Sequence, residues 1–170
     1  MRGGFVIEPL GAWNRSAFAC GTAALDRYLR EQASQDIKRL VASCFVAVET
    51  ATQTLAGYYT LAATSVAASD LSPEFVKRLP RYPLLPAALI GRLAVDQRYQ
   101  GKGLGSALLA DAALRVLRSE MKALALIVEA KDEKAMAFYR FQGFTPFVSH
   151  PMSLYLALET FRKGANSHRG

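Results

Sequence analysis

The sequence predicts one α/β (α+β) domain in which helices flank a central sheet. Its length of 170 residues is that of a single domain with its own core. A composition of 51% hydrophobic and 21% charged residues is typical of globular proteins. Short β-branched and aromatic runs alternate with segments of helical periodicity, and no linker-like tract separates them. We therefore expect a domain over residues 1–162 and a basic, flexible tail over residues 163–170.

The first third of the chain predicts a short apolar strand, a helix and a hairpin. The strand begins at Val6 and Ile7, and the hairpin pairs residues 43–49 with residues 54–61 across a polar turn. The helix spans residues 23–40, where apolar side chains recur at helical spacing at Leu25, Leu29, Ala33, Ile37 and Leu40.

The remainder of the chain continues this alternation. Residues 70–79 predict a short helix, with Pro73 in its first position and either Asp70 or Ser72 as its cap. Prolines at 80, 83 and 86 then require an extended or looped path. The elements expected after this point are a strand over 87–95, a helix over 104–117, a strand over 123–128, a helix over 132–141 and a strand over 152–158.

The charge and cysteine content limit the possible partners and location. A net charge of +7 favours anionic partners such as nucleic acid or phosphorylated cofactors, although solubility alone also explains a basic surface. Cys20 and Cys44 form no disulfide framework and are expected as buried, reduced thiols. The chain shows neither an export signal nor an apolar run of membrane-spanning length, so we expect a cytoplasmic protein without membrane contact.

A glycine-rich segment, residues 98–105, joins the strand over 87–95 to the following helix. Glycines let backbone N–H groups approach an anion closely, and the start of the helix adds the positive end of its dipole. Arg98 and Lys102 add full positive charges. The spacing fits neither the dinucleotide pattern Gly-x-Gly-x-x-Gly nor the nucleoside-triphosphate loop, so the segment predicts a pyrophosphate site of another kind.

Residues 98–103, Arg-Tyr-Gln-Gly-Lys-Gly, resemble the Arg/Gln-x-x-Gly-x-Gly/Ala signature of the GNAT superfamily of N-acetyltransferases. Residues 135–144 resemble its second hallmark, Ala-x-x-Phe-Tyr-x-x-x-Gly-Phe. The resemblance implies a GNAT-like domain with a mixed, mostly antiparallel sheet of six to seven strands and about four helices. It also implies acetyl-CoA as the cofactor, and no metal.

The same resemblance implies roles for individual residues. Main-chain groups of the strand before the loop would pair with the pantetheine arm, and N–H groups of the loop would cradle the pyrophosphate. Tyr139 would lie near the thioester sulfur and act as the catalytic acid. The implied cofactor-binding residues are Leu93, Ala94, Val95, Arg98, Gln100, Gly101, Lys102, Gly103, Leu104, Gly105, Ser106 and Phe138.

An obvious general base is missing from the sequence. Arg92 stands on the strand before the loop, where a carboxylate is often placed in lysine acetyltransferases. Glu129 is the acidic residue that chain order places nearest, but a structural salt bridge explains it equally well, and water could serve instead. An α-amino group, with a pKa near 8, is already partly neutral at cellular pH and needs only weak assistance.

Residues 18–29 resemble a narrower group, the GNAT-fold toxins of toxin–antitoxin pairs, which often read Phe-x-Cys-Gly-x-x-x-Leu-Asp-x-Phe-Leu here. Tyr28 replaces the second Phe, and the similarity continues through residues 79–83, 91–96 and 130–132. The resemblance implies acetylation of the α-amino group of aminoacyl-tRNA, a ribbon-helix-helix antitoxin and a homodimer. The basic residues expected to contact tRNA are Lys38, Arg39, Lys77, Arg78, Arg81 and Arg92.

Two alternatives remain open at the level of the sequence. One is a GNAT enzyme that acetylates protein N-termini or a small-molecule amine, although an excess of Lys and Arg disfavours cationic acceptors. The other is a noncatalytic regulator that binds acetyl-CoA or nucleic acid. The retained Gly101, Gly103 and Tyr139 argue against it.

Overall fold

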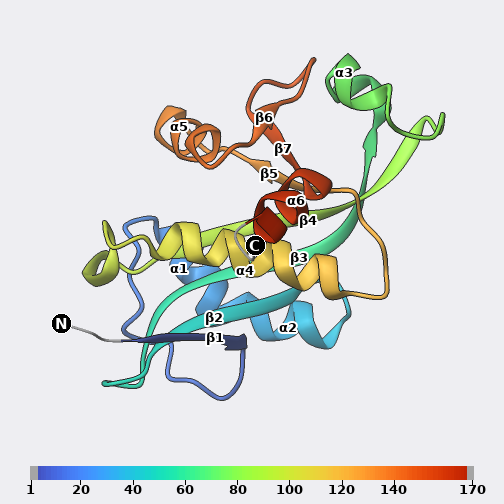
Figure 1. The fold of residues 1–170 in the computed structure, drawn as a ribbon. Coiled ribbons are helices and arrows are strands. Elements are labelled where there is room, and N and C mark those ends of the chain that lie inside the picture. Colours follow the sequence, from blue (N-terminus) through green and yellow to red (C-terminus); the bar gives the residue numbers. More distant parts are fainter. Residues whose placement is uncertain (1–3, 168–170) are drawn as a thin grey trace. The chain divides into compact units, whose positions relative to one another are not determined.

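The sheet has the strand order β1-β2-β3-β4-β5-β7-β6 in a computed structural model that describes residues 4–167, with side chains through residue 162 (Figure 1). β4 pairs with β5 in parallel, whereas β1/β2, β2/β3, β5/β7 and β6/β7 are antiparallel. The predicted mixed, mostly antiparallel sheet is therefore confirmed. The strands are β1 (Phe5–Pro9), β2 (Ser43–Glu49), β3 (Thr54–Ala67), β4 (Leu84–Val95), β5 (Ala125–Glu129), β6 (Thr145–Pro146) and β7 (Ser153–Ala157).

The helices appear largely where the periodicity predicts them. They are α1 (Ala23–Arg27), η1 (Tyr28–Gln32), α2 (Ala33–Lys38), η2 (Ala68–Asp70), α3 (Pro73–Val76), η3 (Gln97–Tyr99), α4 (Leu104–Arg118), α5 (Glu133–Phe141) and α6 (Leu158–Ser167). Within the described residues, no helix combines the length and the apolar character needed to cross a membrane.

The chain divides into two compact units, each with its own hydrophobic core. The first comprises Met1–Ala62 and Gly91–Ala112, and the second comprises Ala63–Ile90 and Ala113–Gly170. β3, β4 and α4 each continue from one unit into the other.

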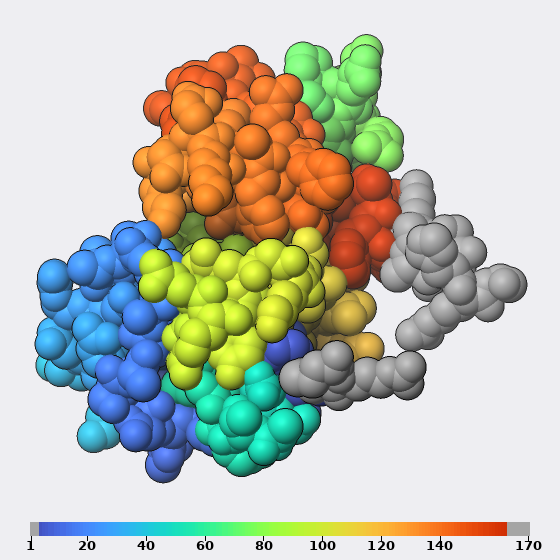
Figure 2. All heavy atoms as spheres, turned by 90° about the vertical axis from the view of Figure 1, so that its left-hand side faces the viewer, coloured from blue at the N-terminus to red at the C-terminus, as the bar shows by residue number. Residues whose placement is uncertain are grey.

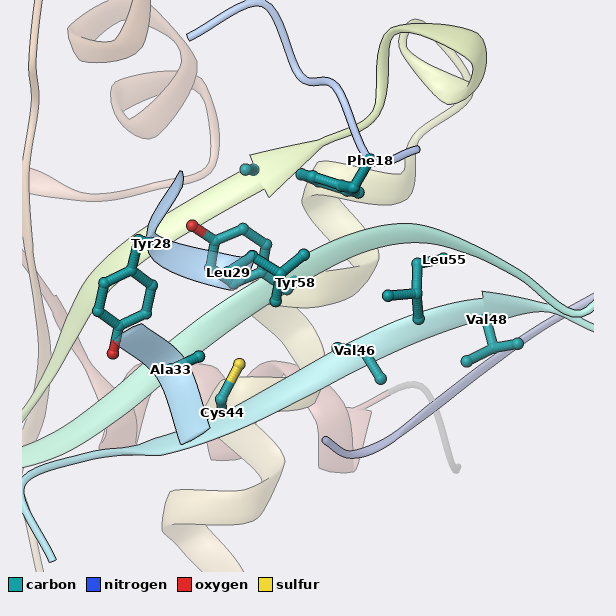
Figure 3. Packing of buried hydrophobic residues seen from close by; sticks show 10 residues of the cluster. Phe18, Tyr28, Leu29, Ala33, Cys44, Val46, Val48, Leu55 and Tyr58 are labelled. Atoms are coloured by element: carbon teal, nitrogen blue, oxygen red, sulfur yellow. The ribbon is translucent and has the colours of Figure 1, made fainter. Parts of the chain in front are cut away.

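In the first unit, β1, β2 and β3 form an antiparallel meander, and the helical run α1–η1–α2 packs its apolar side onto it (Figure 3). Leu29 and Ala33 are fully buried, as predicted, whereas Ile37, assigned to the same face, is 37% exposed. The middle of this run, η1, is a π-helix, which the periodicity did not reveal. Leu40 was wrongly assigned to the buried face: α2 ends at Lys38, and Leu40 turns the chain at φ 61° with its side chain 93% exposed.

In the second unit, the core gathers residues of β3, β4, β5 and β7 around Phe75 and Tyr155, whose rings stack 5.8 Å apart. Ser72 caps α3 by accepting a hydrogen bond from the N–H of Phe75, which settles the choice between Asp70 and Ser72. α3 ends at Val76, three residues earlier than predicted. Asp132 caps α5 by accepting from the N–H of Ala135.

Two elements near the C-terminus were not predicted. β6 is only two residues long and pairs with β7, and α6 begins directly after β7. α6 reaches Ser167, so the tail proposed for residues 163–170 begins inside a helix. Residues 168–170 lie outside the described part of the chain, and the flexibility of the tail stays a prediction.

Candidate functional site

The glycine-rich loop lies in the first unit, between η3 and the start of α4. Gly101 and Gly103 adopt φ values of 76° and 81°, which favour glycine, and a Cβ atom at either position would meet no atom within 4 Å. Residues 101–103 are exposed, and Figure 2 shows this part of the chain in yellow-green at the molecular surface. The first N–H groups of α4 have no carbonyl partner within the helix. An open loop and a helix start together suit a pyrophosphate.

Gly57 in β3 allows the start of α4 to pack closely against the sheet. A Cβ atom there would lie 3.0 Å from the carbonyl oxygen of Ala94, 3.1 Å from the Leu108 side chain and 3.4 Å from that of Leu104. Only a residue without a side chain fits this contact unless its neighbours move. The position of the helix start therefore depends on Gly57.

Asp96 organises the beginning of the loop from a buried position. Its side chain caps η3, with Oδ1 accepting from the backbone N–H of Arg98 (2.9 Å) and Oδ2 accepting from that of Ala19 (3.0 Å). Burial opposes ionisation of this carboxyl group, but the hydrogen bonds from Arg98 and Ala19 outweigh it and lower the pKa of Asp96. Sequence reasoning missed this role because the partner Ala19 lies 77 positions away in the chain.

The sequence predicts that Arg98 adds a full positive charge to the loop, but in the structure this charge is paired with Asp96. Its Nε and Nη2 atoms donate to the two carboxylate oxygens of Asp96 at 2.9 and 3.0 Å, and this pairing raises the pKa of the guanidinium. Much of its charge is thus balanced within the protein. Lys102 is exposed, with its ammonium 5.8 Å from the centre of the Tyr99 ring, and it stays available to an anion.

The side chain of Gln100 ties the loop to the N-terminal segment. Its Nε2 donates to the carbonyl oxygens of Cys20 and Val95, both at 2.9 Å. The backbone N–H of Gln97 adds a bond to the carbonyl of Ala19. The stretch around residues 18–20 therefore supports the loop, and Gln100 has a structural role beyond the predicted cofactor contact.

Arg92 projects from β4 onto an aromatic ring of the helical run. Its guanidinium lies 3.6 Å from the centre of the Tyr28 ring, a close cation–π contact. The Tyr28 hydroxyl donates to Asp36 (2.6 Å), which also accepts from Gln32. The hydrogen bond from Tyr28 lowers the pKa of Asp36, with Arg92 and Arg39 adding to the effect. The arrangement fixes a positive charge on the strand immediately before the loop.

The other predicted tRNA-binding residues fall into two exposed groups. Lys38 and Arg39 stand at the end of α2 in the first unit. Lys77, Arg78 and Arg81 stand at the end of α3 and in the turn after it, in the second unit. Arg78 lies over the Phe75 ring and forms a long ion pair with Glu159 at 3.9 Å, so its charge is partly shared.

Tyr139 lies on α5 in the second unit and is buried, with 8% of its surface exposed. Its ring packs against those of Phe138 and Phe144, at centroid distances of 5.3 and 5.6 Å. Burial raises the pKa of its hydroxyl to about 12. The group is therefore a neutral proton donor at cellular pH. Glu129, at the end of β5, is exposed.

The cysteines are not arranged for nucleophilic chemistry. Neither forms a disulfide, and burial raises the pKa of Cys44 to about 12. Cys20 is half-buried, and its thiol contacts the carbonyl of Thr22 at 3.5 Å. Across residues 4–162, whose side chains the structure describes, no group of three or more His, Cys, Asp or Glu side chains is placed to hold a metal ion.

Comparison with known proteins agrees with these features. The acetyltransferase (GNAT) family profile matches residues 12–144. A protein of Sinorhizobium fredii named "Probable toxin TacT" is 30% identical over 168 residues, covering 92% of this chain and 93% of that protein. A "tRNA-acetylating toxin" of Mycobacterium tuberculosis is 36% identical over 149 residues, covering 86% and 87%.

Solved structures extend the comparison to the whole fold. AtaT complexed with acetyl-methionyl-tRNAfMet superimposes with a TM-score of 0.86 at 28% identity, covering 94% of this chain and 98% of AtaT. A Tyr→Phe mutant of KacT gives a TM-score of 0.86 at 29% identity, with the same coverage. AtaT bound to acetyl-CoA and the C-terminus of the antitoxin AtaR gives 0.78 at 25% identity, covering 92% and 94%. With the family profile spanning the loop and Tyr139, this chain belongs to the acetyltransferase (GNAT) family.

Proposed function

We propose that this enzyme is a toxin that transfers the acetyl group of acetyl-CoA to the α-amino group of aminoacyl-tRNA and so blocks translation. The main support is the position of Arg92, whose guanidinium is held on the Tyr28 ring. Lysine acetyltransferases often have a carboxylate at this place on the strand. A fixed cation repels cationic amines and attracts a polyanion. Relatives described as tRNA-acetylating, and AtaT in complex with an acetylated aminoacyl-tRNA, support the same acceptor.

The loop suits the cofactor. Open space at Gly101 and Gly103, and the N–H groups at the start of α4, fit a pyrophosphate, and Lys102 adds a free positive charge. Main-chain groups of Leu93 and Val95 would hold the pantetheine arm. The remaining proposed contacts of the cofactor are Ala94, Arg98, Gln100, Leu104, Gly105, Ser106 and Phe138. When bound, acetyl-CoA supplies an acetyl group activated as a thioester.

The protein supplies the acid of the reaction from Tyr139. The neutral α-amino nitrogen forms a bond to the acetyl carbonyl carbon, the carbon–sulfur bond breaks, and Tyr139 donates its phenolic proton to the departing sulfur. The proton lost by the amine passes to water, which also reprotonates Tyr139. A weakly basic α-amino group needs no stronger base, and Glu129 is therefore dispensable in this scheme.

The proposed function also includes two protein partners, an antitoxin and a second copy of this chain. We infer that a small ribbon-helix-helix antitoxin neutralises the enzyme. A solved complex of AtaT with a protein named as the antitoxin AtaR supports an antitoxin partner. We also infer that the enzyme is a cytoplasmic homodimer. Co-expression with the gene adjacent to its own should yield a stable complex. Sedimentation of the purified enzyme should give twice the mass of the chain.

A comparison of acceptors tests the function. Initial rates with acetyl-CoA should be high with a mixture of aminoacyl-tRNAs and absent with the same tRNAs after deacylation. Peptides with free N-termini and polyamines represent the alternative substrates. Higher kcat/KM for either of these than for every aminoacyl-tRNA would refute the proposal.

A further inference from the structure

A short turn in the second unit presents an aromatic ring to solvent. Tyr82 lies between Pro80 and Pro83 and is 62% exposed, although large aromatic side chains are usually well covered. It belongs to the loop that leads from α3 to β4 (Figure 1). None of the roles described above for the cofactor loop, Arg92 or Tyr139 involves this ring.

The backbone holds this ring on a stiff support. The N–H of Tyr82 donates to the carbonyl of Pro80 (2.9 Å), and the N–H of Ala68 donates to the carbonyl of Pro83 (3.0 Å). The two prolines fix their own φ angles, and Pro83 also restricts the backbone of Tyr82. A ligand that stacks on the ring would therefore lose little of its binding energy to ordering the turn.

Positive charge surrounds the same turn. Lys77, Arg78 and Arg81 are all exposed within six positions of Tyr82, and only Arg78 has an acidic partner among the described salt bridges, Glu159. Glu74 in α3 is the acidic residue of this segment. An exposed aromatic ring among cations is the combination with which proteins bind unpaired nucleotides, since the ring stacks on a base and the cations meet its phosphates.

We propose that Tyr82 is a stacking platform for an unpaired base of the single-stranded 3′ end of the tRNA, with Arg81 and Lys77 on the adjoining phosphates. This inference rests on the proposed function, because an aminoacyl group is attached to that unpaired end. The interior of a duplex would not suffice as ligand, since both faces of its bases are already stacked. Tyr82 is thus a substrate-binding residue outside the cofactor loop.

Three variants test the stacking role. Tyr82→Ala should raise KM for aminoacyl-tRNA roughly tenfold, whereas Tyr82→Phe, which keeps the ring, should stay within about twofold of wild type. Leu84→Ala removes an equally exposed apolar side chain without a ring and serves as the matched control. KM for acetyl-CoA should be unchanged in all three, which also shows that they fold.

Binding measurements then identify the part of the tRNA that is recognised. Fluorescence anisotropy should show that Tyr82→Ala weakens binding of an acceptor-stem hairpin with a single-stranded 3′ end but not of the same hairpin with a blunt end. The salt dependence should be retained in Tyr82→Ala and reduced in Arg81→Ala, because only the latter loses a phosphate contact.

The two proposals fail in distinguishable ways. If wild type acetylates aminoacyl-tRNA and Tyr82→Ala has an unchanged KM, the stacking role is wrong and the function stands. A lower sedimented mass for Tyr82→Ala would also overturn the stacking role, since the ring would then belong to a contact between two copies of the chain. If wild type acetylates no aminoacyl-tRNA, the function itself is wrong.

Discussion

At the scale of one residue, the buried carboxylate of Asp96 organises the start of the glycine-rich loop. It joins Arg98 and Ala19, so the start of the loop and the N-terminal segment share one acceptor. Gln100 reinforces the same junction. The sequence showed the glycines, which act through the local backbone, but not these contacts, which exist only after distant segments meet.

The pKa of Asp96 leads to a prediction for stability. Because folding lowers its pKa from the ordinary value of 3.8, its ionised form stabilises the protein above that value, and this contribution is lost as the pH falls through the lower, folded pKa. Asp96→Asn should reduce the free energy of unfolding by about 1–3 kcal/mol at pH 7. The difference from wild type should shrink below about pH 4 in urea titrations. The exposed Glu133→Gln should show a much smaller change, and an equal change in both variants would contradict the role of Asp96.

Tyr139 gives the prediction for catalysis. Tyr139→Phe keeps the packing of the ring but removes the acid, so kcat should fall by roughly 10²- to 10⁴-fold while KM for acetyl-CoA changes little. With its pKa raised to about 12, ionisation of Tyr139 should not lower the wild-type rate below about pH 11. Steady-state kinetics from pH 6 to pH 10 test both points. Full activity of Tyr139→Phe would remove Tyr139 from the mechanism.

The contact between Arg92 and Tyr28 predicts a split between the two substrates. Tyr28→Leu removes the ring beneath the guanidinium and should raise KM for aminoacyl-tRNA about three- to tenfold, with KM for acetyl-CoA nearly constant. Tyr28→Phe keeps the ring and loses only the bond to Asp36, so its effect should be smaller. Thermal unfolding checks that both variants are folded. Equal KM changes for both substrates would indicate a general structural role instead.

At the scale of elements, the close packing of β3 against the start of α4 determines the position of the glycine-rich loop. Gly57→Ala would place a methyl group 3.0 Å from the carbonyl oxygen of Ala94 in β4 and 3.1 Å from the Leu108 side chain in α4, so the end of β4 and the start of α4 must both move slightly. We expect a loss of about 1–3 kcal/mol in stability and a higher KM for acetyl-CoA. Gly11→Ala adds a methyl group where no atom lies within 4 Å and should change neither quantity. An unaltered KM in Gly57→Ala would mean that the helix start does not position the cofactor.

The elements also show which sequence patterns are reliable. Helical periodicity found α4, a β-branched and aromatic run found β2, and a continuous apolar run found β5, because each pattern reflects burial of these side chains. The pattern failed where chain geometry, not burial, decides the outcome. Leu40 fits the apolar repeat but follows the helix end, and Ile37, which follows the π-helix η1 in the repeat, is 37% exposed.

At the scale of the whole molecule, the sequence predicted the sheet type and the family because two ordered motifs span the cofactor loop and α5. It could not show that Arg98 is paired with Asp96 or that Arg92 is fixed on Tyr28, since both contacts depend on how the side chains lie in the folded protein. These contacts determine which positive charges of the site are paired within the protein and where they are held. We expect Lys102 and Arg92, together with the exposed Lys38 and Arg39, to be the cations of the first unit that meet anionic ligands.

The acceptor of the acetyl group is the central claim, and the chemical identity of the product tests it most directly. The enzyme is incubated with isotopically labelled acetyl-CoA and aminoacyl-tRNA, the tRNA is digested with nuclease, and the 3′-terminal aminoacyl-nucleoside is analysed by mass spectrometry. We predict label on the α-amino group of the esterified amino acid. Label on the nucleobases, on protein N-termini or on no tRNA product at all would contradict the assignment.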